Sequence, residues 1–263
     1  MGRFMDFLPS TKVPTSGGTT SFTSAEVPGT GVIAYVVALT GTNNLLSALS
    51  RIRVRAGGPS IIDADISHFR TYIQRQAQSH ESPATTDARI IIPLNFNDPY
   101  LTEDMQDLCQ FPAGLAPTVE LVYGTFTVAT DTVQIGWIKS DVTPTHYQSY
   151  VTNVLNFSAS TNNNTYPITQ KGLIAGYSIN TTGLSRLKLV AGGVQVHQYS
   201  ATLGIESQIM NDLDTLTNPM FRRIYPSRQA LPSGTSYAEV DASSLWAGVA
   251  NEIGIMTYIP QGQ

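Results

Sequence analysis

The chain has 263 residues, of which 41% are hydrophobic and only 13% are charged, about half of the charged fraction usual in soluble domains. Its formal net charge of −4 excludes a basic surface field of the kind that binds nucleic acid by counterion release. A single cysteine, Cys109, excludes an internal disulfide framework. The polar surface must therefore be built mainly from uncharged residues, which is typical of β proteins with many turns and of proteins whose surface is covered by neighbours.

The N-terminal residues 1–18 combine an apolar tip with prolines and glycines, which indicates a flexible arm. The tip consists of Phe4, Met5, Phe7 and Leu8. We expect this arm to dock on protein, either its own body or a neighbouring copy; a membrane surface is the alternative. No long apolar run of the kind found in a signal peptide or a membrane span is present, so we expect synthesis in a cytosol.

The first half then contains several short strand-like segments and one helix. Residues 32–39 are apolar on both faces, as in a buried strand. The helix is expected after residue 63 or 65, because Ile66, Phe69, Ile73 and Ala77 recur at helical spacing. The other expected strands are residues 19–24, 50–56, 90–94, 118–123, 126–128 and 133–138, with a helical turn after Thr102.

A nine-residue stretch of the first half returns in the second half. Residues 50–58, SRIRVRAGG, are echoed by residues 185–193, SRLKLVAGG. In both copies apolar residues alternate with basic ones, which predicts a strand with its apolar side inward and its basic side outward. The closing Gly-Gly predicts a turn with positive φ. Three shorter echoes keep the same order: residues 31–34 with 172–175, 89–93 with 222–226, and 113–116 with 247–250. The chain therefore carries an internal duplication.

The second half repeats the plan of the first. Strands are expected at residues 150–157, 185–190, 223–226 and 251–259, and a helix carries Ile205, Ile209, Leu213 and Leu216. These patterns predict an all-β fold of two tandem eight-stranded jelly-roll β-sandwiches, each with one short inserted helix. The predicted boundaries are an arm at 1–18, a first jelly roll at 19–140 and a second at 141–263. Immunoglobulin-like sandwiches are the alternative, but they do not usually carry such a helix.

Catalytic and metal signatures are sparse. The four histidines form no metal-ligand pair, and the sequence has no nucleophile elbow, phosphate-binding loop or dinucleotide fingerprint. Cys109 is interpreted as a small buried hydrophobic residue. One acidic cluster could hold calcium, or could instead cap the turn after Thr102. Its members are Asp98, Glu103, Asp104 and Asp107.

The chain combines duplicated sandwiches, a helix after the Arg-rich strand of each half, and few charges overall. In these features it resembles the double jelly-roll major capsid proteins of tailless icosahedral viruses with an internal membrane. It is most similar to the corticovirus-like capsid proteins of bacteriophages. The resemblance covers the chain from about Thr19 onward.

The resemblance implies a structural, non-enzymatic protein of the virion, made in the host cytoplasm and assembled as a homotrimer. A trimer of two-sandwich chains fits a six-fold lattice position. It also implies contacts with neighbouring capsomers and with other capsid or membrane proteins, an arm (Phe4, Met5, Phe7, Leu8) near internal lipid, calcium as a cofactor in some members, and no direct nucleic-acid contact. The alternative is a double-sandwich glycan-binding protein or a glycan-acting hydrolase.

Overall fold

The computed structural model describes residues 2–41, 45–69, 87–95, 102–154, 163–168, 172–180, 182–200, 214–215, 220–231, 236–244 and 252–263. The chain forms two compact units, residues 1–148 with 260–263, and residues 149–259. The units divide inside a strand, after residue 148, which lies beyond the predicted boundary at residue 140.

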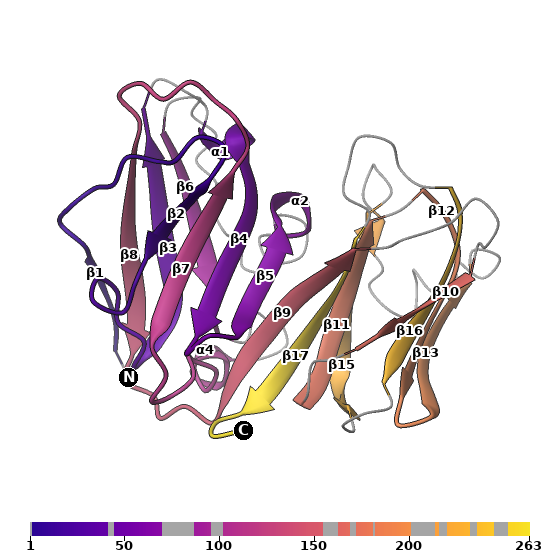
Figure 1. Cartoon of the computed structure of the whole chain (residues 1–263). Coiled ribbons are helices and arrows are strands. Elements are labelled where there is room, and N and C mark those ends of the chain that lie inside the picture. Colours follow the sequence, from indigo (N-terminus) through magenta and orange to yellow (C-terminus); the bar gives the residue numbers. More distant parts are fainter. Residues whose placement is uncertain are drawn as a thin grey trace. The chain divides into compact units, whose positions relative to one another are not determined.

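The first unit is a sandwich of two antiparallel four-stranded layers (Figure 1). One layer has the order β1-β8-β3-β6, and in the other the neighbours run β5-β4-β7-β2. Apart from β4 and β5, neighbouring strands are not consecutive in the sequence, as in a jelly roll. The strands are β1 (Arg3–Phe7), β2 (Thr19–Phe22), β3 (Val32–Thr40), β4 (Leu49–Ala56), β5 (Ser60–Asp65), β6 (Asp87–Pro93), β7 (Pro117–Tyr123) and β8 (Thr132–Ser140).

Alternating residues of these strands fill the core between the layers. Ile52 and Val54 of β4 are fully buried, while Arg51, Arg53 and Arg55 between them are partly exposed. Opposite them, the core-facing side chains of β3 and β6 are Tyr35, Val37, Leu39, Ile90 and Ile92. The predicted period-two pattern of residues 50–56 is thereby confirmed.

The second unit repeats this topology. Its layers have the orders β14-β15-β11-β17-β9 and β10-β16-β12-β13. Apart from the added strand β14, β9 to β17 take the places that β1 to β8 take in the first unit, in the same chain order. The strands are β9 (His146–Val154), β10 (Asn163–Pro167), β11 (Gly172–Asn180), β12 (Thr182–Ala191), β13 (Val194–Ser200), β14 (Asp214–Thr215), β15 (Met220–Leu231), β16 (Tyr237–Ser244) and β17 (Glu252–Pro260).

The duplicated stretch forms β4 in one unit and β12 in the other. Each strand ends at a glycine pair with positive φ, at 64° and 127° for Gly57 and Gly58 and at 59° and 80° for Gly192 and Gly193. Only glycine adopts such angles without strain, so the predicted turn is confirmed. A further strand, which was not among the predicted ones, follows this turn. In both units the chain folds back as a paired strand, β5 or β13.

Helices in the described residues are short: α1 (Leu45–Ala48), α2 (Ile66–Phe69) and α4 (Glu103–Gln106). α2 starts where the first helix was expected, but residues 70–86 lie outside the described residues, as does most of the helix expected around residues 205–216. The cap at Thr102 is confirmed, because the backbone N–H of Met105 donates to its Oγ1 at 3.4 Å. In the described part of the chain, no helix is long and apolar enough to cross a membrane.

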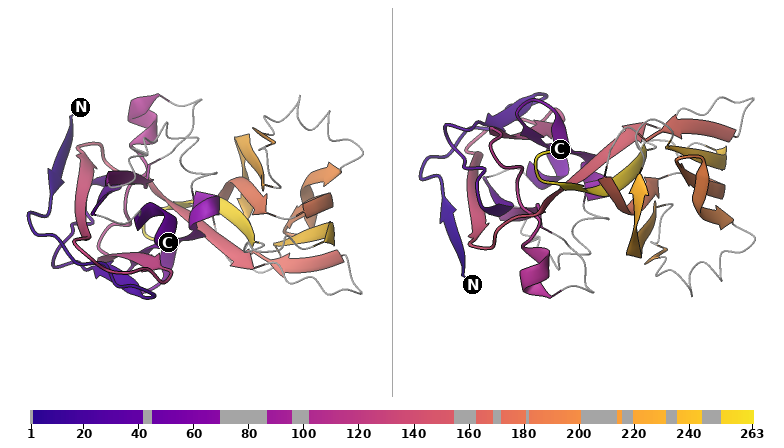
Figure 2. Two further views of the ribbon diagram at one scale, coloured as in Figure 1. Left: turned by 90° about the horizontal axis from the view of Figure 1, so that it is seen from above. Right: turned by 90° about the horizontal axis from the view of Figure 1, so that it is seen from below.

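Two predictions for the first unit are wrong. Residues 126–128 form no strand; the N–H of Phe126 donates to Ser16 Oγ at 2.9 Å and its carbonyl accepts from the same hydroxyl, so a side chain replaces the sheet partner. The N-terminal segment is not a flexible arm over its whole length. Arg3–Phe7 is strand β1, which pairs with β8 and completes the four-stranded layer. Figure 2 shows this indigo strand along the edge of the first unit.

Candidate assembly surfaces

The outer face of the layer β1-β8-β3-β6 is apolar. Because side chains alternate along a strand, the residues between the buried core positions point away from the core. On β3 these are Val36 and Ala38, on β6 Ile91, and on β8 Ile138, and all four are only half-buried. Met5 and Phe7 of β1 lie on the same face, with exposed fractions of 65% and 55%. We name this set of six side chains the outer apolar face.

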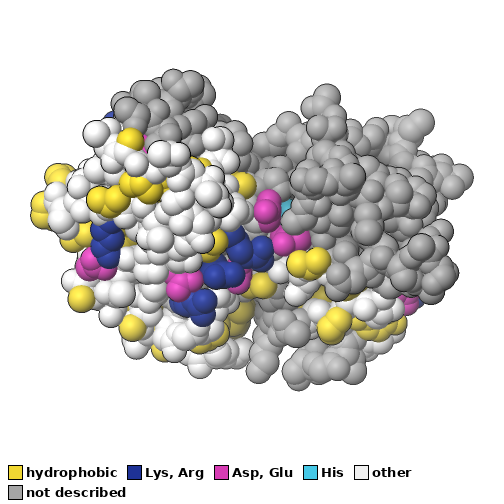
Figure 3. Space-filling view, turned by 45° about the horizontal axis from the view of Figure 1, so that its top comes forward, with side chains coloured by type: hydrophobic (Ala, Val, Ile, Leu, Met, Phe, Trp, Pro, Cys, Tyr) yellow, Lys and Arg dark blue, Asp and Glu magenta, His cyan; other side chains and the backbone are white. Residues whose placement is uncertain are grey.

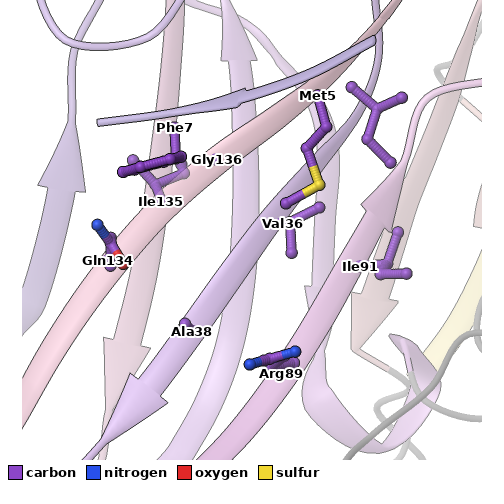
Figure 4. Close-up of a pocket in the computed structure, with 10 residues that line it drawn as sticks. Met5, Phe7, Val36, Ala38, Arg89, Ile91, Gln134, Ile135 and Gly136 are labelled. Atoms are coloured by element: carbon purple, nitrogen blue, oxygen red, sulfur yellow. The ribbon is translucent and has the colours of Figure 1, made fainter. Parts of the chain in front are cut away.

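The outer apolar face surrounds a hollow of about 460 Å³ (Figure 4). Its lining contains two polar side chains, Arg89 from β6 and Gln134 from β8. Gln134 is engaged, since its Nε2 donates to the carbonyl oxygen of Leu8 at 2.9 Å. Arg89 is exposed and is the one charged residue that lines the hollow. The site is therefore a shallow hydrophobic surface with a single cation.

A glycine sets how closely β1 approaches this surface. Gly136 stands opposite Phe7 in the pairing of β1 with β8. A Cβ atom at Gly136 would lie 2.9 Å from the backbone oxygen of Asp6 and 3.3 Å from Phe7 Cβ, which is closer than ordinary van der Waals contact. The absence of a side chain at Gly136 lets Phe7 and the rest of β1 pair closely with β8.

An ion pair fixes the start of β1. The Nε and Nη2 of Arg3 donate to the two carboxylate oxygens of Asp107, each at 2.9 Å, which is the strong bidentate geometry. Asp107 is only 3% exposed. The backbone N–H of Gly2 donates to the carboxylate of Asp141 at 3.1 Å. Neither contact has a local signal in the sequence, because the partners are more than 100 residues apart.

The predicted apolar tip keeps its exposed character within this strand. Phe4, Met5 and Phe7 are exposed by 55% or more, whereas Leu8 is half-buried and its backbone N–H donates to the carbonyl oxygen of Ile135 at 2.9 Å. The side chains remain available for contacts outside the chain, although the backbone is held in the sheet.

The predicted calcium cluster is described only in part. Asp98 lies outside the described residues, and Glu103 and Asp104 belong to α4, with side chains that are also outside them. Asp107 is bound by Arg3, and Asn95 Nδ2 donates to it at 3.4 Å. In the described part of the chain, no group of three or more acidic, histidine or cysteine residues could hold a metal. The calcium site stays a prediction.

The outer faces of the other two layers carry ion-pair ladders. In the first unit Asp63 accepts from Arg51 and Arg53, and Glu120 accepts from Arg55 at 3.1 Å. In the second unit Arg186 and Lys188 lie 3.7 and 3.5 Å from Glu239. Figure 3 shows basic side chains next to acidic ones on the visible face. The basic residues of the duplicated stretch are thus balanced by carboxylates and form no anion-binding patch.

Two residues considered for chemistry lie in the core of the first unit. Cys109 has no exposed surface, which confirms its interpretation as a buried hydrophobic residue. His68 of α2 is likewise fully buried. Burial lowers the pKa of His68 to about 4. The negative charge of Asp65 raises this pKa, and the positive charge of Arg51 lowers it. His68 is therefore neutral at pH 7 and inaccessible to a substrate.

Comparison with known proteins shows the fold class. No family model matches the sequence, and no curated protein sequence matches it. Solved structures do match over almost the whole chain, and those described next are double jelly-roll proteins. The chain is therefore an all-β protein with the double jelly-roll fold, as the sequence predicted.

Three of these structures are viral capsid proteins. The major capsid protein of Bacteriophage PM2 aligns with a TM-score of 0.63 and 11% identity, covering 98% of this chain and 97% of its own. That of STIV, the Sulfolobus Turreted Icosahedral Virus, aligns with a TM-score of 0.64 and 12% identity, covering 99% and 96%. The Faustovirus major capsid protein aligns with a TM-score of 0.57 and 10% identity, covering 99% and 90%. At these identities the likeness concerns the fold.

Proposed function

We propose that this protein is a structural major capsid protein that forms homotrimeric, pseudo-hexameric capsomers in an icosahedral virus shell. The observation that carries the proposal is the strand-for-strand repetition of one jelly-roll topology in a single chain. Three copies of such a chain present six similar sandwiches, so a trimer can occupy a six-fold lattice position while obeying three-fold symmetry.

The surface chemistry supports assembly rather than catalysis. The chain has few charges, and its outer apolar face is open and shallow. An enzyme site would be expected to gather convergent polar groups in a pocket. The solved structures with the same fold, named above, are capsid proteins, which supports the same function, a place in the virion shell and contacts with neighbouring capsomers.

The finer parts of the proposal concern lipid and calcium. We propose that the shell encloses an internal membrane and that Phe4, exposed on β1 by 56%, contacts lipid or a membrane-associated virion protein. We also propose that the acidic cluster binds calcium. A calcium ion that uses Asp107 as a ligand competes with Arg3 for that carboxylate. Measuring the melting temperature of the protein with added calcium and with a chelator tests calcium binding, which should raise the melting temperature.

The solution mass of the purified protein tests the main proposal. Multi-angle light scattering should give three times the chain mass of 28.4 kDa, and concentrated trimers should form hexagonal arrays in electron micrographs. A strict monomer at every concentration, with and without calcium, would contradict the capsomer proposal and direct attention to glycan binding and hydrolysis.

A further inference from the structure

We propose that residues 260–263 act as a latch that completes the first unit only after the second unit has been synthesised. The first unit consists of residues 1–148 together with residues 260–263. In the sequence, the second unit is therefore an insertion between two parts of the first. The latch is a property of the single chain and does not depend on the proposed trimer.

Gln261 is the central residue of the latch. Its backbone N–H donates to the carbonyl oxygen of Thr145 at 2.9 Å, and its Oε1 accepts from the N–H of Ala113 at 2.9 Å. Its Nε2 donates to the carbonyl oxygen of His146 at 2.9 Å and to that of Gln110 at 3.4 Å. One half-buried residue thus joins two segments of the first unit that are distant from each other in the sequence.

The latch also has a turn of its own. The N–H of Gln263 donates to the carbonyl oxygen of Pro260 at 3.4 Å, and Gly262 stands between them with a φ of 86°. A positive φ at this position is typical of a type II turn, in which glycine is favoured. Outside the turn, the hydroxyl of Tyr147 donates to the backbone oxygen of Gln263 at 3.1 Å. The latch is therefore a folded element that the first unit holds at two of its residues.

The two segments that the latch joins are also bonded directly to each other. The N–H groups of Thr145 and His146 donate to the carbonyl oxygen of Leu108 at 2.8 and 3.1 Å. The N–H of Gln110 donates to the carbonyl oxygen of His146 at 3.0 Å. Cys109 pairs with His146 as an isolated β-bridge and has no exposed surface. The latch thus binds the residue that follows Cys109 and the residue that pairs with it.

The side chain at position 261 has to be an amide for all of these bonds to form. A glutamine amide has one acceptor oxygen and two N–H donors, and here the oxygen accepts from one N–H while the nitrogen donates to two carbonyls. Without this side chain, the N–H of Ala113 and the carbonyl of Gln110 lose a partner, which is costly where polar groups are shielded from water. Because every group is uncharged, the latch should depend little on salt.

The order of synthesis gives the latch its consequence. Domains generally fold as units, beginning at the N-terminus of the growing chain. Here residues 108–113 and 145–147 are synthesised early, whereas Gln261 follows β17, the last strand of the second unit. The junction between these two segments of the first unit thus stays without its clamp while the second unit is being made. The latch therefore ties the integrity of the first unit to synthesis of the second.

Thiol labelling of the native Cys109 in folded protein tests the latch. The buried thiol reacts only when the junction opens, and such opening reports local stability. We expect Gln261→Ala to label ~10-fold faster than the unmodified protein, since loss of roughly one net hydrogen bond changes an opening equilibrium by about that factor. Gln263→Ala removes an exposed side chain of the same type from the same segment, so this matched control should label at the unmodified rate. Deletion of residues 260–263 should label at least as fast as Gln261→Ala.

Hydrogen exchange locates the opening. In Gln261→Ala, exchange should accelerate at the amide of Ala113, while the amides of β3 and β8 keep their protection. Equal labelling rates in the unmodified protein, Gln261→Ala and the deletion would overturn the latch. Faster exchange spread evenly over the first unit would also overturn it, because it would show a general loss of stability. Cys109 is buried within its own unit, so the comparison applies to a monomer or a trimer, and neither outcome decides the proposed function.

Discussion

At the level of single residues, Gly136 controls how β1 is seated on β8. Replacement with alanine places a Cβ 2.9 Å from the backbone oxygen of Asp6, so the edge strand must shift. We expect Gly136→Ala to lower the free energy of unfolding by about 1–3 kcal/mol, as for other overpacking changes. Gly2→Ala, where a Cβ meets nothing within 4 Å, is the control. Urea denaturation of both variants measures the difference, and equal stabilities would mean that β1 tolerates the extra atom.

The ion pair between Arg3 and Asp107 also determines how β1 is held on the first unit. Asp107 is buried, while the side chain of Arg3 is 37% exposed, so the pair is partly screened. Removing Arg3 leaves a buried carboxylate without its cation, and we expect Arg3→Met to cost about 1–3 kcal/mol. In a double-mutant cycle with Asp107→Asn, the two losses should be non-additive. Additive losses in urea denaturation would show that the pair contributes no coupling energy.

Burial of His68 predicts a pH dependence of stability. Its pKa is about 4 in the folded chain and about 6.5 in the unfolded chain. The unfolded state therefore binds the proton more readily, so the contribution is fully present above pH 6.5 and is lost as the pH falls towards 4. The loss amounts to about 3 kcal/mol at most. His68→Gln should flatten the unfolding free energy between pH 4 and 6.5, and an unchanged slope would contradict the prediction.

At the level of elements, β1 is the strand on which the sequence and the structure differ most. If residues 1–8 were an arm, deletion would leave stability unchanged. As a strand, the segment forms a ladder of five residue pairs with β8, and backbone hydrogen bonds contribute about 1 kcal/mol each. Deletion of residues 1–8 should lower the unfolding free energy by at least ~2 kcal/mol and increase hydrogen exchange in β8. An unchanged melting temperature would favour the arm.

Local patterns explain which elements could be predicted. The alternation of Ile52 and Val54 with arginines defined the buried side of β4, and Gly57-Gly58 defined its end, because both signals are encoded within a few residues. The strand β1 has no such signal, since its partner β8 lies more than 120 residues away. The apolar run at residues 32–39 was interpreted as buried on both faces, whereas Val36 and Ala38 are only half-buried. A continuous apolar strand predicts that both faces will be covered, but not which molecule covers them.

At the level of the whole molecule, the duplication connects fold and function. Two sandwiches with one topology present equivalent faces, so three copies of the chain present six such sandwiches. The acidic cluster and the apolar tip were both recognised from the sequence. The contact between Arg3 of β1 and Asp107 of the cluster was not, because no local pattern encodes it.

The apolar nature of the open face gives the last prediction. Met5→Glu introduces a charge at a position that is 65% exposed in the chain, so the fold should be unaffected, but burial of this apolar face in the assembled state would desolvate the carboxylate. We expect the dissociation constant of the trimer to rise at least 10-fold, with little dependence on salt because the contact is mainly hydrophobic. Val128→Glu, at another exposed apolar position, should leave assembly unchanged. Sedimentation equilibrium at two salt concentrations measures both variants, and equal trimer stability for the two would place the contact between chains on a different surface.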